Sequence, residues 1–396
     1  MTRVTSIFSQ ILQLYPRLEF ESAVKFHKAA RHSRGFSCWG QFIAMLFCQL
    51  GRAHSLREIC QGLAASEGKL RHLGLPETPK RSTLSYANAH RPWQLYEMIF
   101  QMLYRRCSAA AAQRERKFSF SHKLLSIDST VITVCTSLFQ WANYTRRKGA
   151  LKVHLLLDHD GYIPKFAVIS DGNKSDISVA LEMEFEAGTM LVFDRGYTRY
   201  GWWAGLTQKG IWFVSRLREN ANYEVIESKT MPPDPQPEEK KTRVTADRKI
   251  VFPGQKRNKT RPEFRLVEIC TAEGEVWEFI TNAHHLEGLT VAAVYKDRWQ
   301  IETFFRSLKQ LLKIKTFIGT SENAVRIQIW TALIAMLMVR YLKLRASFNW
   351  SLSNLLALLR QQLFVHRDLW GWLNQPFEPP PEVTNLQQSL WAERTG

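Results

Sequence analysis

Three acidic residues, far apart in the chain, have the types and settings that metal-dependent phosphoryl transfer needs. Asp128 stands within LLSIDSTVITV, a run typical of a buried strand, where a carboxylate must be hydrogen-bonded, paired with a cation or bound to a metal. Asp194 ends a short apolar run before a polar turn, and strand ends are where α/β sheets usually display functional groups. Glu302 lies in a helical segment further along. Carboxylates from separate elements can hold two hard divalent cations on either side of a scissile phosphate.

Each of these acids also has a structural interpretation. For Asp128 alone, a structural cause and metal binding are comparably favoured. Asp194 is also consistent with a turn that holds a local ion pair. Neighbouring acids compete for the same roles, although Asp160–Gly161 is typical of a turn and Asp176 could cap a helix.

The predicted helix around Glu302 carries groups that bind phosphate. Four residues share one face of a continuous helix, within roughly 60° at about 100° per residue: Tyr295, Arg298, Glu302 and Lys309. An adjoining apolar stripe would pack against the core: Ile301, Phe304, Phe305, Leu308, Leu311 and Leu312. The alternative is a surface helix in which Arg298 and Glu302 form an ordinary i,i+4 ion pair.

Three motifs occur in a set order along the chain. They are IDST at 127–130, FDRGY at 193–197 and the spacing YxxRxxxExxxxxxK at 295–309. In this order the sequence resembles the DDE transposases of the bacterial insertion-sequence-4 family, over about residues 120–345. The resemblance implies that Asp128, Asp194 and Glu302 ligate two Mg²⁺ ions per active site, with Mn²⁺ able to substitute. It also implies that three residues hold transposon-end phosphates: Tyr295, Arg298 and Lys309.

The same resemblance implies a reaction and its partners. Water would attack the phosphodiester at an element end, and the released 3′-hydroxyl would then attack target DNA, so both steps are in-line displacements. The partners would be double-stranded DNA, as terminal inverted repeats and as target, and a second protomer in a homodimeric synaptic complex. Two alternatives stay open: a catalytically silent DNA-binding repressor derived from a transposase, and an RNase H-like nuclease without strand transfer.

The alternation of helical and strand patterns predicts an α/β protein. Together with the resemblance, it gives an RNase H-like catalytic core with a mixed five-stranded sheet and flanking helices. A β-rich insertion would interrupt this core, and an all-helical DNA-binding domain would precede it. The predicted segments are 1–118 for the basic helical domain, 119–218 for the first part of the core, 219–283 for the insertion, 284–365 for the helical completion of the core and 366–396 for a C-terminal tail.

Charge favours a polyanionic partner. The chain has 54 Lys and Arg against 36 Asp and Glu, a net charge of +18, and nucleic acid is the first expectation. The surplus is concentrated in residues 1–118, where a capping box at 55–58 precedes a second helix near 81–90. This arrangement predicts a helix-turn-helix whose Arg81 and Arg91 reach DNA. A plain helical bundle with solvated basic residues is equally favoured.

Two further residues are candidates for DNA contact. Trp299, beside Arg298, could stack on a base, and Arg216 at the end of a predicted strand could meet a phosphate. Their structural alternatives are packing for the tryptophan and solvation of a strand end for the arginine.

The remaining patterns indicate the compartment. Six scattered cysteines without a CxxC pair argue against a zinc site or a disulfide framework. The longest apolar run, at 329–339, is shorter than the roughly 20 residues that span a bilayer, so it predicts a buried helix and no membrane partner. The N-terminus lacks the pattern of a secretory leader. We therefore expect a bacterial cytoplasmic protein associated with the nucleoid.

Overall fold

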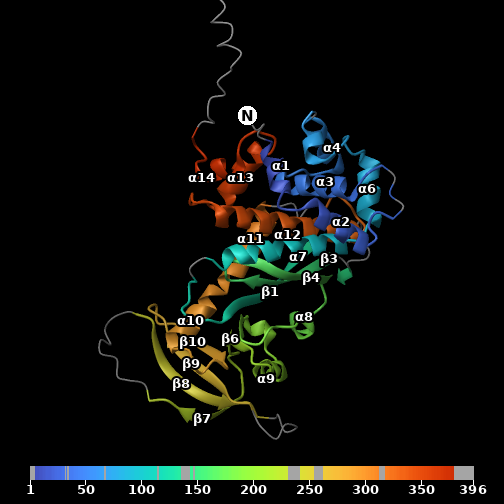
Figure 1. The fold of residues 1–396 in the computed structure, drawn as a ribbon. Helices are drawn as coiled ribbons and strands as arrows, with labels where there is room; N and C mark the ends of the chain where they lie inside the picture. The colour runs from blue at the N-terminus through green and yellow to red at the C-terminus, as the bar shows by residue number, and fades with distance from the viewer. Residues whose placement is uncertain are drawn as a thin grey trace, which may run out of the picture.

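One mixed sheet begins beside a body of helices and extends to the opposite end of the molecule (Figure 1). The computed structural model describes residues 5–31, 33, 35–66, 68–113, 116–134, 143–145, 148–230, 241–253, 262–311 and 317–378. The sheet has ten strands in the order β2-β3-β1-β5-β6-β10-β9-β8-β7, and β4 also pairs with β3. The strands are β1 (Lys123–Val134), β2 (Asn143–Thr145), β3 (Lys148–Asp158), β4 (Ile163–Asp171), β5 (Thr189–Val192), β6 (Trp212–Arg216), β7 (Glu224–Ser228), β8 (Arg243–Val251), β9 (Phe264–Cys270) and β10 (Val276–Thr281).

The strands up to β6 combine antiparallel and parallel pairing. β1, β3 and β4 form an antiparallel meander, whose second turn contains Gly161 in the left-handed region at φ 77°. β5 and β6 run parallel to β1, and parallel neighbours need crossover connections. Helices α8 (Asp176–Glu182) and α9 (Tyr200–Gln208) supply them. The sequence prediction of a mixed α/β arrangement is confirmed.

The segment 219–283 is β-rich, but it continues the same sheet. β10 pairs antiparallel with β6, with Phe279 opposite Arg216, and β9, β8 and β7 follow in turn. The sheet therefore extends beyond the five strands predicted for the core, because the strands of the predicted insertion join it. A physical reason is that β6 would otherwise be an edge with unpaired backbone groups, and β10 satisfies them.

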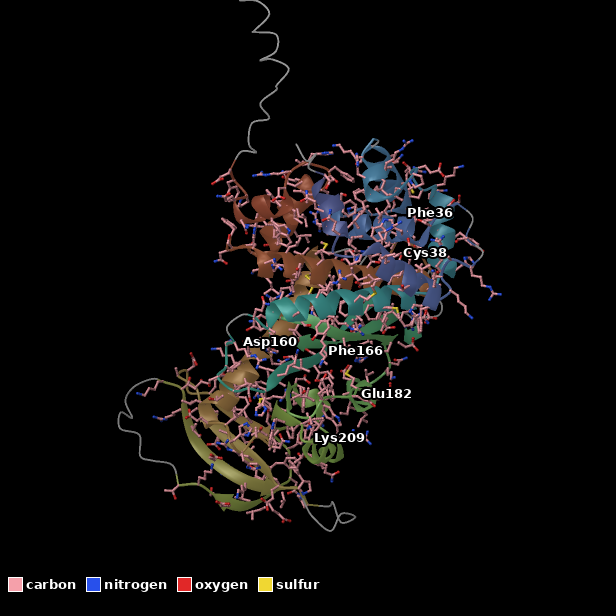
Figure 2. All side chains as sticks on the ribbon, viewed as in Figure 1. Phe36, Cys38, Asp160, Phe166, Glu182 and Lys209 are labelled. Atoms are coloured by element: carbon pink, nitrogen blue, oxygen red, sulfur yellow. The ribbon has the colours of Figure 1, made fainter. Side chains whose placement is uncertain are left out.

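Helices from both ends of the chain form one body beside the sheet (Figure 1). From the N-terminal part come α1 (Ile7–Leu12), α2 (Arg17–Phe26), α3 (Cys38–Leu50), α4 (Leu56–Ala64), α5 (Leu70–Leu73), α6 (Arg81–His90) and α7 (Gln94–Ala111). From the C-terminal part come α11 (Trp299–Leu311), α12 (Glu322–Arg345), α13 (Leu352–Gln362) and α14 (Leu369–Asn374). Helix α10 (Gly288–Asp297) packs instead against β6, β8, β9 and β10 of the sheet. Figure 2 shows Asp160 and Phe166 where this body meets the sheet.

Helix α12 is the centre of the helical body. It packs against α3, α6, α7 and α13, and the predicted buried run 329–339 lies within it. By length and composition α12 could cross a membrane, but 78% of its apolar window is buried inside the protein, as in a core helix. Residues 1–118 therefore do not pack as a separate unit, because they share one hydrophobic core with α12.

The predicted C-terminal tail begins too early. Within 366–396, helix α14 buries Leu369, Trp372 and Leu373, and Trp350 Nε1 donates to the Leu373 carbonyl at 2.8 Å. The apolar spacing within LWGWL gives this short helix a face that packs against α1 and against Trp350. Residues 379–396 lie outside the described residues.

Candidate active site

Asp128 lies in the middle of β1, opposite Leu155 of β3. Its Oδ1 accepts a hydrogen bond of 2.7 Å from the Ser129 amide, and one fifth of its side chain is exposed. Burial raises the pKa of this carboxyl to about 7, and the negative charges of Asp194 and Glu302 add to the rise. The Ser129 amide and Arg298 act in the opposite direction. The charges of Asp194 and Glu302 therefore both act on the Asp128 carboxyl.

Asp194 follows β5, where the strand ends. It caps the short 3₁₀ helix Arg195–Tyr197 by accepting from the Gly196 amide at 2.9 Å. A Cβ on Gly196 would lie 2.9 Å from Asp194 Oδ1, so a larger residue here would require the carboxylate to shift. The Ser215 hydroxyl donates to the Asp194 carbonyl at 3.3 Å and ties the turn to β6.

The predicted continuous helix at 295–309 is broken at Arg298. Helix α10 ends at Asp297 and α11 begins at Trp299. The Arg298 amide donates to Tyr295, and the Ile301 amide donates to Arg298, both with an i to i+3 spacing that tightens the chain. The single-wedge prediction is therefore wrong, because Tyr295 belongs to a different helix from Glu302.

Arg298 joins two of the acids from this junction. Its Nη2 lies 2.8 Å from Glu302 Oε1, and its Nη1 lies 3.7 Å from Asp128 Oδ2. Its side chain is buried, and its guanidinium carbon lies 5.5 Å from the centre of the Tyr295 ring. This arrangement is not a surface i,i+4 pair, because the guanidinium is buried and also lies close to Asp128 on β1.

Comparison with known proteins identifies the family. A family model described as "Transposase DDE domain" matches residues 119–338. The chain belongs to the DDE transposase family. A second model, described as a domain of unknown function (DUF4372), matches residues 3–76.

Relatives of this DDE transposase agree with that assignment. A Sinorhizobium fredii protein described as a transposase, y4zB, is 30% identical over 327 residues, which cover 82% of this chain and 88% of that protein. A Geobacillus stearothermophilus protein described as a transposase for insertion sequence element IS5377 is 28% identical, with 66% and 67% covered. A solved structure of the piggyBac transposase synaptic complex with hairpin DNA aligns at 9% identity and a TM-score of 0.43, covering 98% and 85%. That TM-score is too low to establish a shared fold.

The donor set of the transposase fits a divalent metal ion. Among the described residues, no three His, Cys, Asp or Glu side chains are already gathered to hold a metal. Arg298 stands between Asp128 and Glu302 instead. Burial is the main cause of the raised pKa of Asp128, and the charges of Asp194 and Glu302 add to it. The fit therefore rests on the chemistry of the donors, because hard carboxylate oxygens are the ligands that Mg²⁺ prefers.

The other residues predicted to contact DNA have varied settings. Lys309 lies two turns beyond Glu302 on α11, and Trp299 is half exposed beside Arg298. Arg216 ends β6, and its guanidinium carbon lies 4.5 Å from the centre of the Trp277 ring. Arg81 begins α6 and is exposed.

Arg91 contradicts its prediction. It is buried, and its guanidinium donates to the carbonyls of Ser37 and Phe36 and to the Gln41 side chain. It follows α6 and closes the α3–α6 contact, so it has a structural role. The sequence pattern located the helix correctly but could not tell which of its cations face inward.

A polar chain behind the acids was missed. Ser126 Oγ lies 2.5 Å from His159 Nε2, and His159 Nδ1 lies 2.7 Å from Asp297 Oδ2. Lys117 Nζ lies 2.5 Å from the other Asp297 oxygen. Ser126 precedes Asp128 by two residues and Asp297 directly precedes Arg298, so these contacts link the segment of Asp128 to the segment of Arg298. The position of Asp297 beside Arg298 in YKDR was the available signal.

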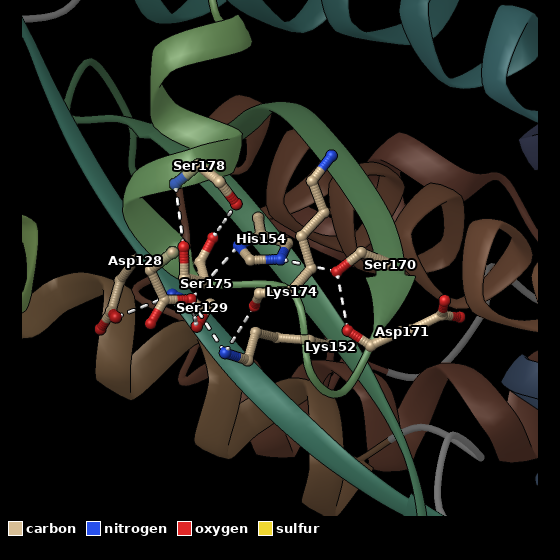
Figure 3. A network of polar contacts seen from close by, with 10 residues as sticks. Asp128, Ser129, Lys152, His154, Ser170, Asp171, Lys174, Ser175 and Ser178 are labelled. Atoms are coloured by element: carbon tan, nitrogen blue, oxygen red, sulfur yellow. Dashed lines mark hydrogen bonds and ion pairs between the residues drawn. The ribbon is translucent and has the colours of Figure 1, made fainter. Parts of the chain in front are cut away.

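A second network lies on the opposite side of β1. Ser129 Oγ donates to Asp176 Oδ1 at 2.6 Å. Asp176 Oδ1 also lies 3.4 Å from Lys152 Nζ and 3.4 Å from His154 Nδ1. Figure 3 shows Ser129, Lys152 and His154 of this network near Asp128. Asp176 is the first residue of α8, and the cap predicted for it is made by Ser175.

Proposed function

We propose that this DDE transposase cleaves DNA at the ends of an insertion sequence and transfers the released strand to target DNA, in a Mg²⁺-dependent reaction. The observation that carries the proposal is the buried Arg298 guanidinium, which lies 3.7 Å from Asp128 on β1 and 2.8 Å from Glu302 on α11, while the charge of Asp194, after β5, also acts on Asp128. The strand order β4-β3-β1-β5-β6, antiparallel then parallel, supports an RNase H-like core.

Each residue would have a definite role. Asp128, Asp194 and Glu302 would hold two Mg²⁺ ions, which supply charge neutralisation to the attacking and leaving oxygens; Mn²⁺ would substitute. Arg298 would turn from the acids towards a non-bridging phosphate oxygen, where a planar guanidinium can donate two hydrogen bonds. Burial raises the pKa of the Tyr295 hydroxyl, so it would stay protonated and donate to phosphate with Lys309.

The partners follow from the same proposal. Double-stranded DNA would bind as terminal inverted repeats and as target, and two protomers would form the synaptic complex. The exposed N-terminal side of α6, with Lys80 and Arg81, would meet the repeats. Trp299 and Arg216 would touch DNA near the acids. Such a protein would act in the bacterial cytoplasm, at the nucleoid.

The proposal is tested with labelled duplexes that carry the element's ends. We expect Mg²⁺-dependent nicking and joining to a target plasmid by the native protein, and neither by Asp128→Asn, Asp194→Asn or Glu302→Gln. DNA affinity should survive these changes. Cleavage without joining would favour a plain nuclease, and binding without cleavage by the native chain would favour a repressor. Equal cleavage by the three variants would refute the site.

A further inference from the structure

A cavity of about 520 Å³ lies on the far side of α11 from the acids. Gln300, Thr303 and Ser307 of α11 line it, whereas Glu302 on the same helix turns towards Asp128. Its other walls come from the chain before β1, the β3–β4 turn, and the C-terminal half of α12. The volume is that of an ordinary ligand site.

Arg340 of α12 lines this cavity as a cation without an acidic partner. Its Nη1 donates to the Tyr162 carbonyl at 2.5 Å, and its guanidinium carbon lies 5.1 Å from the centre of the Phe304 ring. Among the described residues its Nε has no hydrogen-bond partner and no carboxylate lies within ion-pair distance. Burial lowers the pKa of Arg340 to about 10, because no carboxylate among the described residues offsets the cost of burying its charge.

Further cations surround the rim. Lys343 follows Arg340 by one turn of α12 and is exposed. Arg116 and Lys117 line the cavity from the chain before β1. Arg116 pairs with Asp160, and Lys117 pairs with Asp297. The cavity thus holds four cationic side chains against two carboxylates. Buried charge is costly unless it is paired, so an arginine left unpaired here indicates an anionic ligand.

The rim favours a polymer over a small anion. Arg116 and Lys117 keep 42% and 59% of their side chains exposed, so they can follow a backbone that passes across the opening. The stacked rings of Phe118 and Phe120, 5.3 Å apart, form an apolar wall beside them. Exposed cations around one inward-set arginine suit a chain of phosphates, of which one enters the cavity.

We propose that this cavity is a second phosphate site, which takes a backbone phosphate of the DNA substrate on the side of α11 opposite the acids. The inference rests on the proposed function, since it assumes a DNA substrate. It adds a contact that the acid cluster, the Tyr295–Lys309 array and the N-terminal helices do not include.

The test measures DNA affinity of the full chain by fluorescence anisotropy as salt is raised. Lys343→Glu and Arg340→Gln should weaken binding of an end duplex about three- to tenfold, and each lost cation should reduce the salt slope by about 1. Lys209→Gln changes an exposed lysine directly after α9, outside the cavity; it is the matched control and should alter neither the affinity nor the salt slope. If Arg340→Gln does not fold, Lys343→Glu and Arg116→Gln carry the test, because both side chains are exposed.

Two results would overturn the proposal. One is an affinity and salt slope in the cavity variants equal to those of the Lys209→Gln control. The other is stabilisation of the native protein, but not of Arg340→Gln, by inorganic pyrophosphate while DNA affinity stays unchanged, which would assign a small-anion site. Because the readout is affinity, it is independent of the acid test: Asp128→Asn abolishes cleavage if the proposed function holds, whatever the cavity binds.

Discussion

The two acids on opposite sides of β1, Asp128 and Asp176, differ in how many polar partners they have. On one side, Asp128 has one backbone donor and a guanidinium 3.7 Å away, and its pKa is raised to about 7. On the other side, Asp176 is bonded to Ser129 and lies close to Lys152, in a network that reaches Ser170 through His154 (Figure 3). The networked acid holds α8 against the sheet. A carboxylate with a raised pKa and few compensating partners is typical of a functional site, which agrees with the role proposed for Asp128.

The largest effect should come from removing Arg298, the cation beside Asp128 and Glu302. Arg298→Ala leaves Asp128 and Glu302 without a positive partner and removes a phosphate ligand, so we expect end cleavage to fall by roughly 10²- to 10³-fold. Gel assays under single-turnover conditions measure it. Arg248→Ala, which breaks a partly exposed pair with Glu268 on the insertion, is the matched control and should cleave normally. A loss no larger than that of the control would show that Arg298 is only structural.

The next effect is a change in the free energy of unfolding, which should have opposite signs for substitutions at Asp128 and at Asp176. The pKa of Asp128 is about 7 in the folded state against an ordinary value of 3.8, so its ionisation destabilises the fold as pH rises from about 4 to 7. Asp128→Asn should therefore raise the free energy of unfolding at pH 8 by about 1–4 kcal/mol and have no such effect at pH 4. Urea denaturation at both values measures it.

Asp176→Asn is the counterpart in that experiment. It should lower the free energy of unfolding at pH 8 by about 1–3 kcal/mol, because it weakens the Ser129 hydrogen bond and the contact with Lys152. Destabilisation by both substitutions would mean that the two sides of β1 do not differ in the way proposed.

Sequence patterns predicted this contrast only in part. Motif order predicted Asp128, Asp194 and Glu302 as the acids of one site: the first lies within an apolar strand, the second at a strand end and the third on a helix with phosphate-binding groups. The same patterns could not show that Asp176 is satisfied, since its partners come from β1 and β3 and depend on strand register. The break at Arg298 and the inward direction of Arg91 likewise depend on tertiary contacts. Periodicity carries no information about those contacts.

A smaller effect should follow from loosening the polar chain behind the acids. Asp297→Asn replaces the carboxylate that binds Lys117 and His159, and it directly precedes Arg298. We expect roughly a tenfold fall in kcat, because a small shift of Arg298 misaligns the acids, with little change in DNA affinity. Binding of Mn²⁺, followed by electron paramagnetic resonance, should weaken as well. A fall in affinity for DNA with kcat unchanged would contradict this positioning role.

The smallest effect tests whether the networked side influences the reactive side at all. Ser129→Ala keeps the amide that donates to Asp128 but deletes the hydroxyl that donates to Asp176. It should cost about 1 kcal/mol of stability and leave cleavage within about twofold of the native rate. Thermal unfolding and the end-cleavage assay measure the two quantities on one preparation. A large loss of cleavage with stability unchanged would mean that Asp176 positions Asp128 through Ser129, and that the two sides of β1 form a single functional unit.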